Sequence, residues 1–234
     1  YAKFGYTPCF RFGWHTVKID ADSKQMRGNG CHPEEYSCHV SSANFQIDES
    51  PLAYLRVRMQ ERAMCVQHPL RDLRAVVDDM HLAGDTLWEV RRGDVLVALA
   101  ICRNETDGTL LRECVFDDEV ACHVLIDTIA AHYGRTEVDV LDTTGLVGDY
   151  FGMARVIDAE AMLVAYAALH PELLLTLNVT DELLQENNGC YRLAEGQCRR
   201  LAETAPGAET YTVAQLTHRV LTEENPLMSL MMND

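Results

Sequence analysis

The chain has few basic residues for its number of acidic ones. Its 234 residues contain 20 Lys and Arg against 36 Asp and Glu, which gives a formal net charge of −16. A protein that binds duplex nucleic acid through the phosphates needs a basic face. The charge balance therefore argues against a nucleic-acid partner and favours cationic or amine partners.

Long apolar runs are also missing. The longest, residues 95–102, is far shorter than the roughly 20 apolar residues of a membrane-spanning helix. No signal-peptide pattern is found in the first residues. The nine cysteines are an odd number without a framework spacing, which favours reduced thiols over disulfides. These features predict a cytoplasmic protein without a membrane span, in which most cysteines are small buried side chains.

The first two thirds of the chain have the pattern of an α+β protein. Helix starts are indicated at Ser50-Pro51 and at Asp117-Asp118-Glu119, and the second helix ends at Gly134. Helical spacing of apolar residues extends from Leu52 to Val66. The other expected elements are strands at residues 10–19, 87–91, 95–103, 110–116 and 138–141 and a helix at residues 72–80.

A second region follows a polar, glycine-containing stretch at residues 144–152. Asp158 is placed to cap a helix that runs to Leu169, and Thr212 begins a capping box for a helix that runs to Leu221. Between them we expect strands at residues 173–179, 190–193 and 198–202, with turns at residues 187–189 and 195–196.

The first six residues, Tyr1-Ala-Lys-Phe-Gly-Tyr6, have the pattern of a last helical turn that a glycine ends. A folded domain rarely begins in this way. We therefore expect the sequence to be the C-terminal part of a larger protein.

Several segments, in order, resemble the Eis-type (enhanced intracellular survival) GNAT N-acetyltransferases. They are Tyr1–Tyr6, Met153-Ala-Arg-Val-Ile-Asp158, Leu177-Asn-Val-Thr-Asp181, Asn187-Asn-Gly-Cys-Tyr-Arg-Leu193 and the ending from Asn225-Pro226 to Asp234. The resemblance implies an α+β fold of three parts joined by a connector. Residues 1–22 would be the tail of a catalytic GNAT domain, 23–49 a connector, 50–150 a second, structural GNAT-like domain and 151–234 a sterol-carrier-protein-like domain.

The resemblance also implies the activity. Such a protein transfers an acetyl group from acetyl-CoA to an amine-bearing small molecule or peptide, and it forms homo-oligomers. Tyr1 matches the residue whose hydroxyl protonates the departing CoA thiolate. The terminal carboxylate of Asp234 matches the group that acts as general base toward the amine. The alternatives are that Tyr1 is only a helix-end aromatic and that Asn233-Asp234 is a disordered tail.

The donor motif of GNAT enzymes, Arg/Gln-x-x-Gly-x-Gly/Ala before a helix, does not occur. Arg27-Gly28-Asn29-Gly30 is followed by Pro33 and a polar run and favours a flexible turn. The strand-to-helix junction at residues 114–120 contains no glycine. We expect the acetyl-CoA site upstream of Tyr1, no cofactor-binding residues here, and no activity of these 234 residues alone.

An alternative function, of a different class, is that of a non-catalytic binding module. In this alternative the sterol-carrier-like domain holds a lipid or another small molecule between its sheet and its helices.

A metal site is the last candidate. Cys31, His32, Cys38 and His39 are the residue types of a structural zinc site. Their spacing is irregular, so an exposed polar excursion without metal is expected. His123 and His132 lie on opposite sides of their helix, and His218 is isolated.

Overall fold

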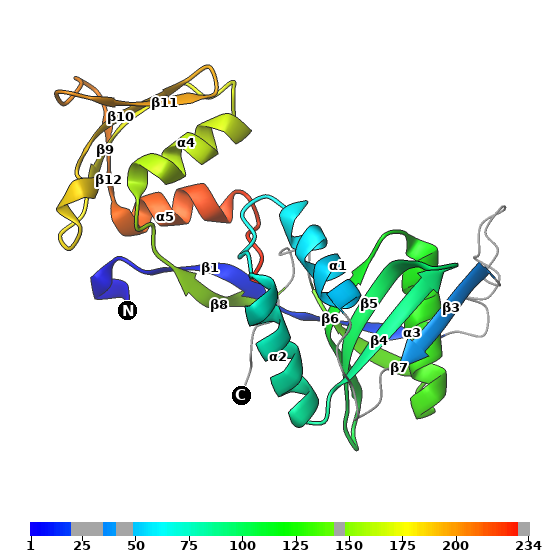
Figure 1. The fold of residues 1–234 in the computed structure, drawn as a ribbon. Coiled ribbons are helices and arrows are strands. Elements are labelled where there is room, and N and C mark those ends of the chain that lie inside the picture. Colours follow the sequence, from blue (N-terminus) through cyan, green and yellow to red (C-terminus); the bar gives the residue numbers. More distant parts are fainter. Residues whose placement is uncertain (20–34, 41–48, 143–147, 229–234) are drawn as a thin grey trace. The chain divides into compact units, whose positions relative to one another are not determined.

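The structure is a computed structural model that describes residues 1–19, 35–40, 49–142 and 148–228. The chain divides into two compact units, and each unit is made of separate segments (Figure 1). Unit 1 joins Tyr1–Arg11 to Asp149–Pro226. Unit 2 joins Phe12–Gly148 to the residues from Leu227 onward.

A six-stranded sheet in the order β2-β7-β6-β5-β4-β3 forms the centre of unit 2 (Figure 1). Strands β3 to β6 pair antiparallel, β6 and β7 pair parallel, and β2 returns antiparallel to β7. The strands predicted for this unit are confirmed, with boundaries that shift by a few residues. Residues 36–40 were expected to belong to a polar connector, and that prediction is wrong for them: they form the edge strand β3, because their backbone pairs with β4. The strands are β2 (Trp14–Lys18), β3 (Tyr36–Val40), β4 (Thr86–Arg92), β5 (Val95–Asn104), β6 (Thr109–Phe116) and β7 (Glu137–Leu141).

Helices cover both faces of this sheet. Helix α3 (Glu119–Tyr133) packs on one face, and α1 (Glu49–Gln60) and α2 (Leu70–Leu82) pack on the other, so β5 is buried from both sides. As predicted, α3 begins at an acidic cap and ends at a glycine. The Asp118 side chain accepts a hydrogen bond from the Ala121 N–H, and Gly134 adopts a left-handed φ of 63°.

Helix α1 is shorter than its apolar spacing predicted. It ends at Gln60, although the pattern continues to Val66. Met64 has a positive φ of 51°, and the Val66 N–H donates to the Leu227 carbonyl at 3.0 Å. Tertiary pairing with the end of the chain therefore removes these residues from the helix, because their backbone groups find a partner far along the sequence.

Unit 1 contains a four-stranded sheet in the order β11-β10-β9-β12 and two helices, α4 and α5, that pack on it. A separate two-stranded sheet joins β1 to β8. The elements are η1 (Ala2–Phe4), β1 (Thr7–Phe12), β8 (Asp149–Ala154), α4 (Ala159–Leu169), β9 (Leu175–Thr180), η4 (Gln185–Asn187), β10 (Gly189–Ala194), β11 (Gln197–Leu201), β12 (Glu209–Thr212) and α5 (Val213–Thr222).

The start signals in unit 1 are confirmed. The Asp158 side chain caps α4 through the Ala161 N–H, and Thr212 and Gln215 form the complete capping box of α5. The turn between β10 and β11 has positive φ at Glu195. The expected turn at residues 187–189 is instead a longer connection, in which η4 precedes β10.

The overall fold is thus mixed α+β with several sheets. Residues 1–11 belong to unit 1, and residues 14–18 form a strand of unit 2. The finer division into three domains, with residues 1–22 as the tail of a catalytic domain, stays a prediction.

The structure bears on two expectations from the composition, one about membrane-spanning helices and one about the cysteines. None of the described helices combines the length and the hydropathy that a membrane crossing requires. The eight cysteines in the described ranges are free thiols, and four of them are buried, namely Cys9, Cys102, Cys114 and Cys190.

Candidate functional site

Tyr1 lies at the start of a tight turn in unit 1. Its carbonyl accepts a hydrogen bond from the Phe4 N–H at 2.9 Å, and Gly5 ends the turn with a left-handed φ of 82°. The Tyr1 residue is 84% exposed, and its ring meets the edge of Tyr6 with centroids 5.9 Å apart. The phenol hydroxyl is therefore accessible to a ligand.

Asp234 lies outside the described residues, so its relation to Tyr1 stays a prediction. The approach to this end can be followed as far as Met228. Helix α5 ends at Thr222, and Asn225 has a positive φ of 45°. Leu227 then forms backbone hydrogen bonds in unit 2, accepting from Val66 and donating to Met64.

The predicted cysteine and histidine group is only partly described, because Cys31 and His32 lie outside the described ranges. Cys38 and His39 are neighbours on the edge strand β3, so their side chains point to opposite faces of the sheet. Burial raises the pKa of the Cys38 thiol to about 11, although a hydrogen bond with Thr128 acts to lower that pKa. The His39 ring instead contacts the Ser37 hydroxyl at 3.1 Å. This pair does not bind one ion from both side chains.

The junction of β6 and α3 is where a strand-to-helix phosphate site would lie in unit 2. Two carboxylates, those of Asp117 and Asp118, lie at the start of this helix. Asp118 caps the helix through the Ala121 N–H, and Asp117 accepts from the Tyr54 hydroxyl at 2.7 Å and forms an ion pair with Arg58. These carboxylates repel a pyrophosphate at the place where backbone amides would bind it. The residues at this junction do not fit the pyrophosphate of acetyl-CoA.

A cavity of about 550 Å³ opens within unit 1 beside the turn that follows Tyr1. Three segments line it: the turn at residues 2–5, the connection between β9 and β10, and the first residues of α5. Charged groups lie among these residues, including Lys3, Glu182 and the Arg155–Asp181 ion pair. This cavity is the candidate site of unit 1.

The Arg155–Asp181 pair is nearly removed from solvent. One Arg155 nitrogen lies 2.8 and 2.7 Å from the two Asp181 carboxylate oxygens, and the side chains are 8% and 1% exposed. Arg155 also donates a hydrogen bond to the carbonyl of Phe4. Arg155 thus joins the turn that carries Tyr1 to the β9–β10 connection.

Further hydrogen bonds complete the surroundings of Asp181. Its carboxylate accepts from the Asn187 amide at 2.8 Å and from the N–H groups of Leu183 and Leu184 at 2.9 and 3.1 Å. Burial alone would raise the pKa of the Asp181 carboxyl, but these hydrogen bonds and the one from Arg155 hold the pKa below its ordinary value. Asp181 is therefore a charged, fixed centre for this loop.

Gly5 fixes the approach of the turn to α5. A Cβ atom at Gly5 would lie 2.6 Å from Cγ1 of Val213, and the positive φ of Gly5 is one that L residues rarely adopt. Glycine is thus required both for the conformation and for the close contact. The turn that presents Tyr1 is held against the start of α5 at the cavity wall.

Sequence reasoning identified Tyr1 but did not assign a role to Arg155 and Asp181. Both residues lie inside the segments that carry the family resemblance, and Arg155 is a charge between the apolar residues Ala154 and Val156. A charge in an apolar setting is a signal for a buried partner. The pairing itself could not be predicted, because the two residues are far apart in sequence and meet only through the fold.

Comparison with known proteins gives structural matches only. No protein-family model matches the sequence, and no curated protein matches it significantly. A GCN5-related N-acetyltransferase from Anabaena variabilis aligns over 93% of this chain and 59% of its own, with a TM-score of 0.64 and 16% identity. A probable N-acyltransferase from Enterococcus faecalis aligns over 93% and 58%, with a TM-score of 0.61 and 14% identity.

An Eis protein is among the matches. Eis1 from Mycobacterium abscessus aligns over 94% of this chain and 60% of its own, with a TM-score of 0.58 and 14% identity. The chain spans about three fifths of the length of these solved structures. The likeness extends over nearly all of the chain, so it concerns the fold of both units. The chain shares its fold with GCN5-related N-acetyltransferases, including an Eis protein.

Proposed function

We propose that the protein to which this chain belongs is an acetyl-CoA-dependent N-acetyltransferase that acts on an amine-bearing small molecule or peptide. The observation that supports the proposal is the structural likeness to N-acetyltransferases over 93% of the chain. The net charge of −16 is compatible with a cationic acceptor. Location in the cytoplasm and assembly into homo-oligomers belong to the same proposal.

The donor site lies outside the described part of the chain in this proposal. Two observations support this placement. The start of α3 is acidic and does not fit a pyrophosphate, and the chain spans only about three fifths of the matched structures. Acetyl-CoA would supply the acetyl group to the whole protein, and the residues described here would contribute to the acceptor side.

Two residues carry the proposed chemistry. Tyr1 is the proton donor to the leaving thiolate, and its exposed hydroxyl suits that role. The terminal carboxylate of Asp234 is the general base toward the amine. Arg155 is a positioning residue in this scheme, because it binds the Phe4 carbonyl in the turn that follows Tyr1.

Lipid binding between the sheet and the helices of unit 1 is less well supported. The space between the four-stranded sheet and α4 and α5 is filled by apolar side chains of the protein itself. They are nearly fully buried and include Leu163, Leu177, Tyr191, Leu193, Leu216 and Val220. A small α+β layer uses such residues for its own core.

The test is acetyl transfer by the full-length protein to a panel of polyamines and aminoglycosides. We expect Tyr1→Phe to lower kcat by about 10²- to 10⁴-fold, the usual contribution of a positioned acid. Tyr6→Phe is the matched control, because the Tyr6 ring lies against Tyr1 yet has no proposed proton to give. Transfer to none of the amines, or equal rates for both variants, would contradict the proposal.

The role of Asp234 needs a separate test. Deleting residues 232–234, or adding several residues after Asp234, is expected to abolish turnover with little change in the thermal midpoint. If both variants keep the normal rate, the terminal carboxylate has no catalytic role.

A further inference from the structure

Two arginines lie directly opposite each other on the β10–β11 hairpin of unit 1. Arg192 and Arg199 are register partners in this antiparallel pair, so their side chains emerge side by side on the same face. Both residues are exposed. Like charges in directly opposed positions destabilise a pair of strands. This arrangement therefore needs a reason other than stability.

No carboxylate neutralises this pair among the described residues. The Arg199 side chain has only a 3.5 Å contact with the Gln197 amide oxygen, and the Arg192 side chain has no hydrogen bond or ion pair in the part of the chain that the structure describes. The sequence holds 36 acidic residues against 20 basic ones. Two adjacent guanidinium groups without an acidic partner are unexpected in a chain with this excess of acidic residues.

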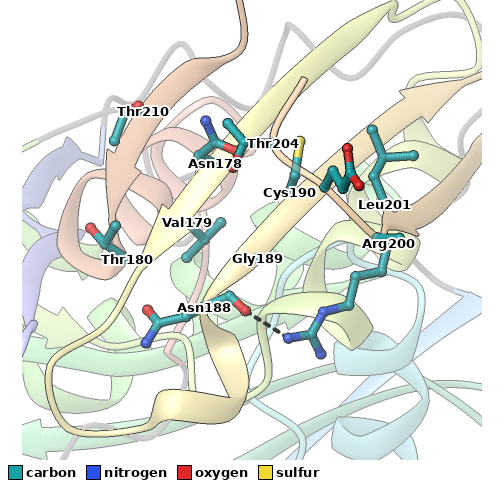
Figure 2. A pocket seen from close by; sticks show the side chains of 12 residues that line it. Asn178, Val179, Thr180, Asn188, Gly189, Cys190, Arg200, Leu201, Thr204 and Thr210 are labelled. Carbon is teal, nitrogen blue, oxygen red and sulfur yellow. Dashed lines mark hydrogen bonds between the residues drawn. The ribbon is translucent and has the colours of Figure 1, made fainter. Parts of the chain in front are cut away.

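A cavity of about 800 Å³ lies on this sheet (Figure 2), and the two arginines lie outside its lining, two residues along the strands from Cys190 and Leu201. Its floor is a row of four register partners across the strands: Thr210 on β12, Asn178 on β9, Cys190 on β10 and Leu201 on β11. Cys190 and Leu201 are each two residues from an arginine on the same strand, so they share its face of the sheet. The floor and the arginines thus form one continuous surface.

The opposite face of the sheet is the core side. Tyr191 and Leu193, which alternate with Cys190 and Arg192, are fully buried, and α4 packs on these strands. Residues 202–204 complete the wall of the cavity beside Cys190. The floor of the cavity therefore lies on the face that the helices do not cover.

Polar groups in the cavity are available to a ligand. The Asn178 amide and the Thr210 hydroxyl make no hydrogen bond within the described residues, although both line the cavity. Arg200 is held at the cavity edge, where it donates to the Asn188 carbonyl at 2.6 Å (Figure 2). The lining thus offers hydrogen-bonding groups near Arg192 and Arg199, and its own charged residues are one base, Arg200, and one acid, Glu203.

We propose that this face of the four-stranded sheet binds a small organic anion. Its phosphate or carboxylate group would bind Arg192 and Arg199, and its hydroxyl-bearing body would occupy the cavity over Asn178. Guanidinium groups bind both kinds of anion in bidentate geometry, and an anion between the two arginines offsets their repulsion. The volume falls within the range of small-molecule pockets, about 300–1,000 Å³.

A polyanionic macromolecule is a poorer fit. The net charge of −16 repels an extended polyanion, whereas a small anion interacts mainly with the nearest charges because salt screens the rest over about 8–10 Å. The site is independent of the proposed acetyl transfer, so its test needs no enzymatic activity.

Calorimetric titration of the 234-residue chain with glucose 6-phosphate, citrate and inorganic phosphate tests the proposal, with glucose as the neutral reference. We expect binding of at least one anion and none of glucose. Glucose 6-phosphate against citrate distinguishes a phosphate ligand from a carboxylate ligand. In the Arg192→Gln/Arg199→Gln variant the affinity should fall by at least about tenfold, because each lost charge-assisted bond is worth about that much.

The matched control is Arg71→Gln/Arg74→Gln on α2, which removes the same charge from an exposed surface and should leave the affinity unchanged. Asn178→Ala should weaken glucose 6-phosphate more than inorganic phosphate, which separates the body of the ligand from its anionic group. The thermal midpoint of the Arg192→Gln/Arg199→Gln variant shows whether it is folded.

Three results would overturn the proposal. The first is that none of the three anions binds at millimolar concentration. The second is that the two double variants lose affinity equally, which would indicate a general charge effect. The third is that a duplex oligonucleotide binds this surface and the small anions do not.

Discussion

Asp181 holds together three parts of unit 1 at the scale of a single side chain. Its carboxylate binds Arg155, the Asn187 amide and two loop N–H groups, and it is 1% exposed. Asp181→Asn would leave the Arg155 charge buried without its partner. We expect a loss of about 3–5 kcal/mol in the free energy of unfolding, measured by urea denaturation.

The exposed Arg71–Asp72 pair is the control, since Arg71→Gln should change the free energy of unfolding by less than about 1 kcal/mol. The pH dependence supplies a second check. Because the pKa of Asp181 is lowered in the folded protein, its stabilisation is full above the ordinary pKa of a carboxyl and is lost as the pH falls through the folded value. The Asp181→Asn variant should lack that acid-side decrease. If the variant loses stability at low pH in the same way as the natural protein, Asp181 is not the group responsible.

Cys122 is expected to react faster than Cys65 and Cys198. A hydrogen bond with Cys114 lowers the pKa of Cys122 against the effect of its burial, whereas burial raises the pKa of Cys65 and Cys198 to about 11. The thiolate is the form that reacts. Iodoacetamide at neutral pH, followed by peptide mass spectrometry, should modify Cys122 before the other two. Faster labelling of Cys65 or Cys198 would show that access of the reagent to the thiol, and not the thiol pKa, determines the rate.

Arg192 is expected to lower the free energy of unfolding, because it lies opposite Arg199. Arg192→Glu would place a carboxylate opposite Arg199 and replace a repulsive pair by an attractive one. We expect the free energy of unfolding to rise by about 0.2–1 kcal/mol in buffer without the anions proposed above. Arg192→Ala should give a smaller rise, because it removes the repulsion without adding attraction. A decrease for Arg192→Glu, measured by denaturation, would mean that the two side chains do not meet.

At the scale of elements, α5 depends on its cap. The Gln215 N–H donates to the Thr212 hydroxyl, and the Thr212 N–H donates to the Gln215 side chain at 2.9 Å. Thr212→Ala should lower the free energy of unfolding by about 1 kcal/mol, and Thr212→Ser should restore most of it. Chemical denaturation measures both. Equal midpoints for Ala and the natural residue would show that the cap contributes nothing.

Elements with a local signal were predictable from the sequence. Each cap of α3, α4 and α5 joins residues only three positions apart, and β5 is one continuous apolar run. The residue types in each short segment are therefore sufficient to predict the element. Strand β12, with the sequence Glu-Thr-Tyr-Thr, has no apolar alternation and exists because it pairs parallel to β9. Strand β8 likewise needs β1 from the start of the chain.

The candidate site follows the same rule. Tyr1 belongs to a short motif and was found from it, whereas the Arg155–Asp181 pair and the opposed arginines arise from strand register and loop geometry. Register depends on the whole sheet, and a shift of one residue would move Arg192 to the core face. Such juxtapositions require the structure.

At the scale of the whole molecule, the chain is expected not to bind acetyl-CoA. The acidic start of α3 does not fit a pyrophosphate, and Asp117 and Asp118 are occupied by their own partners. Calorimetry of the 234 residues with acetyl-CoA should give no heat of binding, whereas the full-length protein should bind. A micromolar Kd for the 234 residues would mean that unit 2 contains a donor site of another kind.

The interleaving of the two units affects how the protein is made. Strand β1 carries the buried residues Cys9 and Phe10, but its partner β8 begins at Asp149, after all of residues 12–148 have been synthesised. At about 5–20 residues per second, translation leaves β1 without its partner strand for roughly 7 to 30 s. Unit 1 therefore cannot finish folding before residues 12–148 of unit 2 have been synthesised. A ribosome pause between residues 12 and 148 would prolong the exposure of these apolar side chains to chaperones.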